Sequence, residues 1–290
     1  MKNNNFLSWL RQWYILIIIF IIYIPLVFII FLSFTNASDK GNIDNDFIWN
    51  GGNNFTDLVN NSDFVTSLLN SLIIAIVVTP ISLIISTLAC FGLWHAAKVY
   101  RSSSIFLSKV SVVTPDIING VSLLLLFSVT WIAIGFDFGF TTLILAHISF
   151  SVPYGMITIY PRMIKMNNNL IYASNDLGYN QIQTFFKVII PYLLPSIIAA
   201  GAIIFSISFD DFIISSLING RITTISIDIF SMAKGIKMWA VTFGALVVLT
   251  TIAVIIIISI FKAKKINKNT SSKKMFKYNN SIRSGYEKSQ

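Results

Sequence analysis

The chain has 290 residues, of which 55% are hydrophobic and only 11% are charged. Soluble domains carry roughly 25% charged residues, so this composition argues against a soluble enzyme or a disordered regulator. The formal net charge of +9 gathers near the C-terminus, and the single cysteine, Cys90, excludes an intrachain disulfide and a cysteine-based metal cluster.

Six apolar stretches are each long enough to cross a bilayer as a helix, which takes roughly 20 residues. The first is longer than the apolar core of a signal peptide and has no small-residue cleavage site after it, so we expect it to be retained. The sequence therefore predicts an all-α membrane protein with six transmembrane helices. The predicted spans cover residues 13–34, 64–94, 110–135, 138–160, 192–217 and 239–261.

The distribution of Lys and Arg predicts the orientation of these spans, because cytoplasmic loops accumulate both residues. With both termini inside the cell, all but four of the 21 Lys and Arg are cytoplasmic, and the exceptions are Lys40, Arg221, Lys234 and Lys237. The first external loop, 36–63, is instead acidic and contains Asp39, Asp44, Asp46, Asp57 and Asp63. We predict a multi-pass plasma-membrane protein with a cytoplasmic segment 1–12 and a six-span domain 13–261.

The connection between the fourth and fifth spans, residues 161–191, is much longer than the usual connection of about 4 to 6 residues. Its sequence predicts two short helices with a break at Gly178. Apolar residues recur at helical spacing in the second part, at Ile182, Phe185, Phe186 and Ile189. Such a helix at the membrane face either docks a partner or lies on lipid headgroups.

Within this connection, Ala173, Gly178 and Pro191 resemble the EAA loop of ABC importer permeases, a helix-glycine-helix element that inserts into a cleft on an ATPase subunit. Three further segments resemble permeases of spermidine/putrescine importers, the PotC-type family. They read TPDIINGVSLLLLF, LAHISFSVPYGMITIYPRM and SFDDFIISSLINGRITTISIDIFSMAKGIK. Together these matches extend over most of residues 65–261.

The resemblance implies the type I ABC importer permease fold, in which the loop 161–191 is a coupling loop. It also implies a non-catalytic subunit that forms a path for spermidine or putrescine with a second, PotB-like permease. Two copies of a PotA-like ATPase would bind ATP below the membrane, and a PotD-like polyamine-binding protein would dock outside. We expect no cofactor or metal in this chain itself.

The loop departs from the family pattern at two positions. Tyr172 replaces the acidic residue that gives the motif its name, and Ser174 replaces the second alanine. A salt bridge from that acidic residue to the ATPase is therefore absent. We expect the contact to depend on shape and on Gly178, since glycine adopts the positive φ that a sharp turn requires.

Three aspartates lie in the predicted spans, where an ionisable side chain costs about 2.5 to 3.5 kcal/mol on insertion scales. Asp116 follows Pro115, about 10 Å from the cytoplasmic end of the third span at 1.5 Å per residue. Asp210 and Asp211 are adjacent near the outer end of the fifth span, about 27 Å from its start. Successive helical positions differ by about 100°, so we expect only one of the pair to face a pathway.

Because no Lys or Arg lies within the spans, a transported cation is the natural counter-ion of these carboxylates. A polyamine fits, since its protonated amines suit spaced carboxylates and its methylene chain suits aromatic walls. Candidate walls are Phe209, Phe212 and Trp131, although each could equally face lipid.

Other interpretations of these polar residues stay open. Thr114-Pro115-Asp116 also reads as a helix start, in which Asp116 is a capping residue. His147 in the fourth span could relay protons, but a lone membrane histidine is more often a packing residue with satisfied hydrogen bonds.

The tail 262–290 is strongly basic and has no apolar periodicity. It contains one acid, Glu287, against Lys262, Lys264, Lys265, Lys268, Lys273, Lys274, Lys277, Arg283 and Lys288. We expect a disordered cytoplasmic tail that attracts anionic membrane lipid, and we do not expect nucleic-acid binding.

The chain lacks a phosphate-binding G-x-x-x-x-G-K-[ST] loop and a zinc-binding H-E-x-x-H motif, so it should not hydrolyse ATP alone. Three alternatives to a polyamine permease remain at this point. They are an ABC permease for another small solute, a proton-coupled secondary carrier working through Asp116 and His147, and a membrane scaffold without transport.

Overall fold

The structure is a computed structural model that describes residues 4–36, 38, 43, 47–232 and 235–287, with side chains between residues 13 and 262. Asp39, Lys40, Asp44, Asp46 and Lys234 of the predicted external segments lie outside the described residues. Within the described part, the regular structure is helical, and Thr35 and Trp49 form an isolated antiparallel β-bridge.

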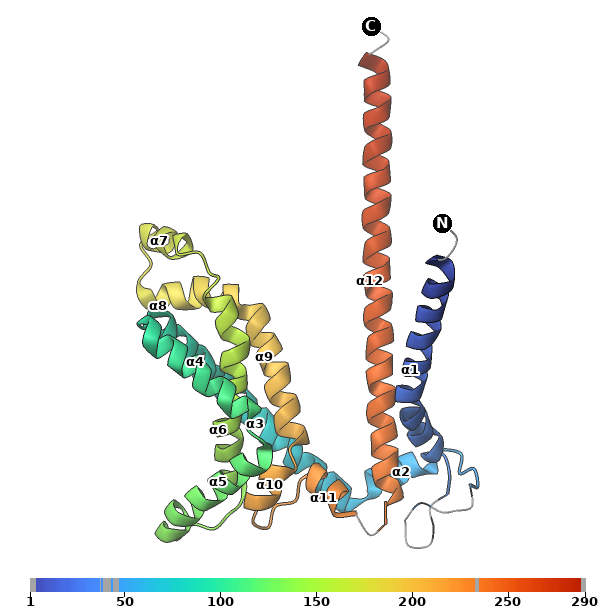
Figure 1. The fold of residues 1–290 in the computed structure, drawn as a ribbon, viewed down its shortest axis with the longest axis vertical. Coiled ribbons are helices and arrows are strands. Elements are labelled where there is room, and N and C mark those ends of the chain that lie inside the picture. The colour runs from blue at the N-terminus through green and yellow to red at the C-terminus, as the bar shows by residue number, and fades with distance from the viewer. Residues whose placement is uncertain (1–3, 37, 39–42, 44–46, 233–234, 288–290) are drawn as a thin grey trace. The chain divides into compact units, whose positions relative to one another are not determined.

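The longer helices are α1 (Asn4–Leu32), α3 (Ser62–His95), α4 (Lys98–Val113), α5 (Asp116–Thr130), α6 (Phe140–Met163), α9 (Ile190–Asp210) and α12 (Met238–Glu287) (Figure 1). The shorter ones are α2 (Asn53–Asn60), α7 (Asn169–Asp176), α8 (Gln181–Thr184), α10 (Ile213–Ile218) and α11 (Ile225–Ser231). A 3₁₀ turn, η1 (Ile132–Ile134), follows α5, and a π-helical turn, η2 (Phe185–Ile189), joins α8 to α9.

Six helices are long and apolar enough to cross a membrane, as the sequence predicts. They are Trp13–Leu32, Ser62–His95, Asp116–Ile134, Phe140–Met163, Gln181–Asp210 and Met238–Lys262. The spans have broad apolar surfaces open to the surroundings, which is expected where lipid and not water is the solvent.

The third span is shorter than predicted, because the sequence around Pro115 breaks the helix. Thr114 has an extended ψ of 132°, since the proline ring disfavours the helical conformation of the residue before it. The segment Lys98–Val113 is thus a separate helix, and Asp116 is the first residue of its span. The expected depth of about 10 Å for Asp116 stays a prediction, because α4 itself packs along the span α6, where Ser108 contacts Met156.

The fifth span also ends earlier than predicted, at Asp210 and not near Leu217. Asp211 has an extended ψ of 124°, and a new short helix, α10, begins two residues later. Asp210 and Asp211 thus stand at a break between two helices, where the 100° rule for neighbours on one helix no longer applies.

The chain forms two compact units. One consists of residues 1–58 with 235–290, and the other of residues 59–234. In the first unit, α1 and the start of α12 pack through Leu32, Met238 and Val241. The segment after α1 is held by Asn54, whose side-chain amide donates to the backbone oxygens of Ser33 at 2.9 Å and Thr35 at 2.7 Å.

Beyond Lys262 the sequence predicts a disordered tail, whereas the structure continues α12 to Glu287. Extending a helix that is already formed fixes only one residue at a time, and lysine has a good helix propensity. Apolar periodicity is therefore not needed for this continuation.

In the second unit, α3, α6 and α9 pack against one another and form the centre of the fold (Figure 1). Small residues let the helices approach closely, as is common in membranes. Ser86 on α3 donates to the backbone oxygen of Val152 at 3.0 Å, and Gly155 on α6 leaves space for its side chain. The most deeply buried side chains of this centre are Ile74, Val78, Leu143, Ile159, Met163, Leu193 and Ile204.

Candidate functional site

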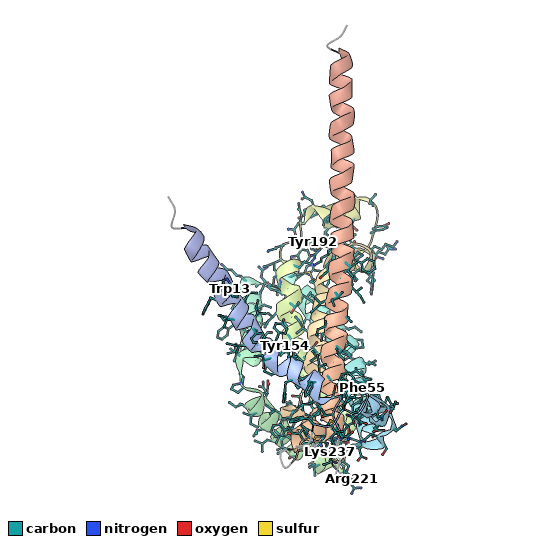
Figure 2. All side chains as sticks on the ribbon, turned by 90° about the vertical axis from the view of Figure 1, so that its right-hand side faces the viewer. Trp13, Phe55, Tyr154, Tyr192, Arg221 and Lys237 are labelled. Carbon is teal, nitrogen blue, oxygen red and sulfur yellow. The ribbon has the colours of Figure 1, made fainter. Side chains whose placement is uncertain are left out.

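The second unit carries candidate sites at opposite ends. Figure 2 shows Tyr192, at the start of α9, at one end and Arg221, in the turn after α10, at the other, with Tyr154 between them. Asp210 and Asp211 belong to the Arg221 end, and the connection 161–191 belongs to the Tyr192 end.

The structure separates the two adjacent aspartates. Asp210 is exposed, whereas the side chain of Asp211 is only 7% exposed. Asp211 caps the start of α10, accepting from the backbone amide of Ser215 at 2.7 Å and from Ser215 Oγ at 2.8 Å. The sequence contains a signal for this cap, since an Asp just before a short apolar helical run is a common helix start.

His147 of α6 completes a buried polar cluster with Asp211. Its Nε2 lies 3.0 Å from Ser215 Oγ and 3.7 Å from Asp211 Oδ2, and its Nδ1 lies 3.0 Å from Ser208 Oγ. Ser215 has one hydroxyl hydrogen, which it donates to Asp211, so Nε2 of a neutral ring donates to Ser215. Nδ1 then accepts from Ser208. All positions of the imidazole are thus satisfied, which favours the packing role of His147.

Replacing Ser215 with alanine is expected to lower the free energy of unfolding by about 1 to 3 kcal/mol, because it removes the buried hydroxyl that accepts from His147 Nε2 and donates to Asp211. Thermal unfolding of the purified chain in detergent measures this loss. The matched control is Ser216→Ala, since Ser216 is an exposed neighbour whose hydroxyl donates to the Ile213 backbone oxygen. Equal effects of the two substitutions would contradict a structural role for the cluster.

Asp116 lies at the other end of α5 from Trp131. It is exposed in the first turn of the helix, where its charge interacts favourably with the helix dipole. The preceding residue, Pro115, makes no side-chain cap. Asp116 therefore starts a helix, as one of the open interpretations states, and its exposed carboxylate is still available to a cation.

The predicted aromatic walls are found near the Asp211 end. Phe212 stacks on Phe230 with ring centroids 3.8 Å apart, and Phe209 stacks on Phe205 at 6.1 Å. Trp131 packs against Phe127 and joins the same apolar cluster as Ile214 of α10. These rings are in part committed to packing within the chain.

The connection between α6 and α9 contains the break that the sequence predicts at Gly178. Gly178 has a φ of +80°, in the region that favours glycine. The amide of Tyr179 donates to the Ser174 backbone oxygen at 3.1 Å, and the amide of Gly178 donates to that of Asn175 at 2.8 Å. These two bonds form a Schellman motif, which ends α7 and turns the chain toward α8.

Side-chain bonds make the turn stiff. Ser174 is buried, and its Oγ lies 2.8 Å from Thr184 Oγ1, which joins α7 to α8. Asn180 and Gln183 form a reciprocal capping box at the start of α8. Serine at position 174 thus has a structural use that alanine could not supply, and the importance of Thr184 was not evident from the sequence.

The ends of the connection are tied to each other and to the bundle. Arg162 Nε donates to the Tyr192 backbone oxygen at 2.7 Å, and its guanidinium lies 5.0 Å from the centre of the Tyr192 ring. Phe185 meets Phe91 of α3 edge to face at 4.8 Å. The connection is therefore expected to move together with α3, α6 and α9.

The four apolar residues that the sequence places on one face divide into two pairs. Phe185 and Ile189 pack inward, and Ile189 is 2% exposed. Ile182 and Phe186 are 70% and 64% exposed. Each pair has the i, i+4 spacing of one helical stripe, so the pairs occupy different stripes. Leu177 beside the turn is 75% exposed, and Tyr172 on α7 is 62% exposed. Ala173 and Pro191 are exposed as well.

Comparison with known proteins gives a consistent result. Residues 59–267 match the family model described as "Binding-protein-dependent transport system inner membrane component". The chain is 40% identical over 266 residues to the "Spermidine/putrescine transport system permease protein PotC homolog" of Mycoplasma pneumoniae, covering 90% of this chain and 93% of that protein. It is 28% identical to PotC of Haemophilus influenzae, covering 88% and 97%.

Solved structures with a similar fold are subunits of ABC transporters. One is a bacterial ABC transporter involved in the import of the acidic polysaccharide alginate, with a TM-score of 0.65 at 12% identity, covering 90% of this chain and 97% of that chain. Another is the inward-facing MetNI methionine ABC transporter, with a TM-score of 0.50 at 17% identity, covering 69% and 95%.

Proposed function

Because the chain belongs to the family of binding-protein-dependent transport system inner membrane components, it is a permease subunit of an ABC importer, and we propose that the importer carries polyamines. The fold is the six-span, all-helical type I permease fold. Such a subunit works with another permease, an ATPase and a binding protein. Here we propose a PotB-like permease, two PotA-like ATPases that bind the ATP, and an external PotD-like polyamine-binding protein, with both termini of this chain in the cytoplasm.

The observation that carries the polyamine assignment is a pair of exposed carboxylates on two helices, α5 and α9, that contain no basic residue. Asp116 begins the span Asp116–Ile134, and Asp210 ends α9, and neither helix contains Lys or Arg. In the part of the chain that the structure describes, neither carboxylate forms an ion pair. In the proposed orientation Asp210 lies at the outer mouth of a cation path, and Asp116 lies further in, near Tyr154 in the middle of α6. Relatives named as spermidine/putrescine permeases support this substrate.

The connection 161–191 is proposed to transmit ATPase closure to the spans. Closure of the ATPases displaces the exposed surface around Leu177, Ile182 and Phe186. Because the Ser174–Thr184 bond stiffens the connection, and Phe185 and Arg162 tie it to the bundle, α3, α6 and α9 then move as one body. This is the rigid-body motion that alternating access requires.

Uptake by the reconstituted importer tests the substrate and the carboxylates together. The chain is co-expressed with its genomic neighbours, purified and placed in liposomes, and ATP-dependent uptake of labelled spermidine and putrescine is followed. Asp210→Asn and Asp116→Asn are each expected to raise the KM for polyamine about tenfold, since a charge-assisted hydrogen bond contributes about 1.5 to 3 kcal/mol. The control is Asp137→Asn, which removes an exposed charge from the loop after α5.

Each alternative gives a different result in this assay. If the ATPase copurifies and hydrolyses ATP but no polyamine is taken up, the permease assignment stands and polyamine is not the substrate. Polyamine uptake that needs a proton gradient and no ATP would indicate a secondary carrier. Equal uptake by the wild type and both Asn variants would show that the two carboxylates do not line the path of the substrate.

A further inference from the structure

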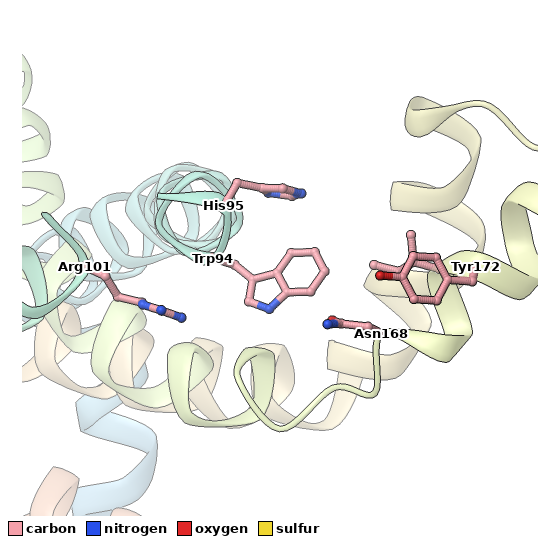
Figure 3. Close-up of a pocket in the computed structure, with 6 residues that line it drawn as sticks. Trp94, His95, Arg101, Asn168 and Tyr172 are labelled. Carbon is pink, nitrogen blue, oxygen red and sulfur yellow. The ribbon is translucent and has the colours of Figure 1, made fainter. Parts of the chain in front are cut away.

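A pocket of about 370 Å³ opens where α3 ends and the connection after α6 begins (Figure 3). One wall is formed by Trp94 and His95 in the last turn of α3 and by Arg101 in the first turns of α4. The other wall is formed by Asn168, Ile171 and Tyr172 at the start of α7. Residues about 70 positions apart in the sequence thus enclose one space, which is within the usual size of a small-ligand site.

The polar groups of this pocket suit an anion. Figure 3 shows the Arg101 guanidinium and the Trp94 indole on one side, with the Asn168 amide and the Tyr172 ring across from them. Arg101 is half-buried, and no carboxylate within the described part of the chain forms an ion pair with it. A guanidinium can donate two parallel hydrogen bonds to a phosphate, and the indole, amide and phenol each carry a further donor.

His95 adds a different group to the same wall. Its Nδ1 lies 3.1 Å from the Phe91 backbone oxygen, which can only accept, so Nδ1 carries a hydrogen. In the neutral ring Nε2 is then an acceptor. The ring is held edge to face against Phe91 and Trp94, each with ring centroids 4.7 Å away. The pocket therefore offers donors for a phosphate beside an acceptor for a hydroxyl.

The position of the pocket points to lipid as the source of that phosphate. His95 is the last residue of a membrane span, and tryptophan at a span end lies at the level of the lipid headgroups. Next to Arg101, Val99 and Tyr100 are 73% and 71% exposed, which supplies apolar surface at the same level. Basic residues at the cytoplasmic face are attracted to the anionic leaflet.

We propose that this pocket binds the headgroup of an anionic phospholipid of the phosphatidylglycerol kind. The phosphate lies at Arg101 with Trp94, Asn168 and Tyr172 around it, and a headgroup hydroxyl donates to His95. Because the bound headgroup contacts both α3–α4 and α7, it holds the connection 161–191 against the bundle. Coupling in the importer then depends on the lipid, a consequence that rests on the proposed function, whereas binding does not.

Native mass spectrometry of the full chain purified with its partner subunits tests the binding. Phosphatidylglycerol and phosphatidylcholine are titrated separately after delipidation. Arg101→Gln is expected to lower the affinity for phosphatidylglycerol about tenfold, as the charged bidentate contact is lost. Lys98→Gln removes the same charge three residues earlier on α4 from an exposed position outside the pocket, and is expected to change the affinity less than about twofold.

The outcomes separate a built site from diffuse attraction. Equal losses in Arg101→Gln and Lys98→Gln, or no loss in Arg101→Gln, would overturn the proposal. If Arg101→Gln fails to assemble, Trp94→Phe keeps the ring and removes the indole hydrogen, and an unchanged affinity in that variant would also overturn it. Arg101→Lys is expected to recover part of the affinity, since the charge stays and the fork is lost.

Further arms distinguish the lipid from a free phosphate ester. Glycerol 3-phosphate and inorganic phosphate at millimolar concentration are expected to leave phosphatidylglycerol bound. Displacement of phosphatidylglycerol by either compound would indicate that the pocket binds a soluble phosphate, and it would contradict the lipid proposal. Equal affinity for phosphatidylcholine would also contradict the proposal. Because the readout is binding, a failure of polyamine uptake leaves this result unaffected.

Discussion

Replacing Gly155 with valine is expected to lower the apparent melting temperature of the purified chain by about 5 °C or more, because overpacking a tight core costs roughly 1 to 3 kcal/mol. A β-carbon at Gly155 would lie 2.8 Å from the β-carbon of Ser86 and 3.3 Å from the end of the Ile204 side chain. Ser86 cannot yield easily, since its hydroxyl is held between the backbone oxygens of Ser82 at 2.6 Å and Val152 at 3.0 Å. The substitution therefore pushes α6 away from α3 and α9.

The matched control is Gly92→Val, because Gly92 is on α3 and has no atom within 4 Å of the position of an added β-carbon. Both substitutions change a helical glycine to the same β-branched residue, so they share the same intrinsic propensity effect. Unfolding in detergent followed by intrinsic fluorescence measures the difference. A melting temperature that falls equally in the two variants would contradict close packing at Gly155.

An aspartate at Ile182 or at Phe186 is expected to reduce ATPase capture by the permease about thirtyfold or more, since a central apolar contact of an interface contributes about 2 kcal/mol or more. Both side chains are more than half exposed in the chain alone, and both follow the turn at Gly178. A charge in such a contact is buried without a partner. Copurification of the ATPase and the rate of coupled ATP hydrolysis give the two readouts.

Gln181→Asp is the control for that prediction, because it places the same charge on an exposed position one residue away in α8. We expect it to retain most of the captured ATPase. If Gln181→Asp and Ile182→Asp lose the ATPase equally, the effect is one of charge and not of the apolar surface. If all variants retain the ATPase, the exposed residues instead lie on lipid headgroups, the other interpretation of this helix.

Ser174 and Tyr172 show how departures from a family pattern can be accommodated in this loop. The turn needs a positive φ, which Gly178 supplies, and the buried bond between Ser174 and Thr184 fixes the two short helices. Tyr172, in the place of the acidic family residue, faces the pocket with Arg101 and His95. With tyrosine at position 172, no carboxylate from this position neutralises the Arg101 guanidinium. Arg101 is therefore available to bind a ligand.

The sequence by itself determined that this is a membrane protein, that it has six spans and that the chain breaks at Gly178. These features depend only on residues that are near one another in the chain. Hydropathy over about 20 residues decides whether a helix can span, and one residue without a β-carbon decides where a turn can form. Local signals also marked the helix start at Pro115, although the expected span was drawn through it. Spans, turns and helix starts of this kind are determined by residues that are close in the sequence.

Only the tertiary structure decided which of the polar and aromatic residues meet. Asp210 and Asp211 are adjacent, yet one is exposed and the other is buried beside His147, some 60 residues away. Phe185 and Phe186 likewise divide between the bundle and the surface. The pocket around Arg101 forms from two distant segments. These outcomes depend on how α3, α6 and α9 pack, since the position of a helix break rotates every later side chain relative to its neighbours.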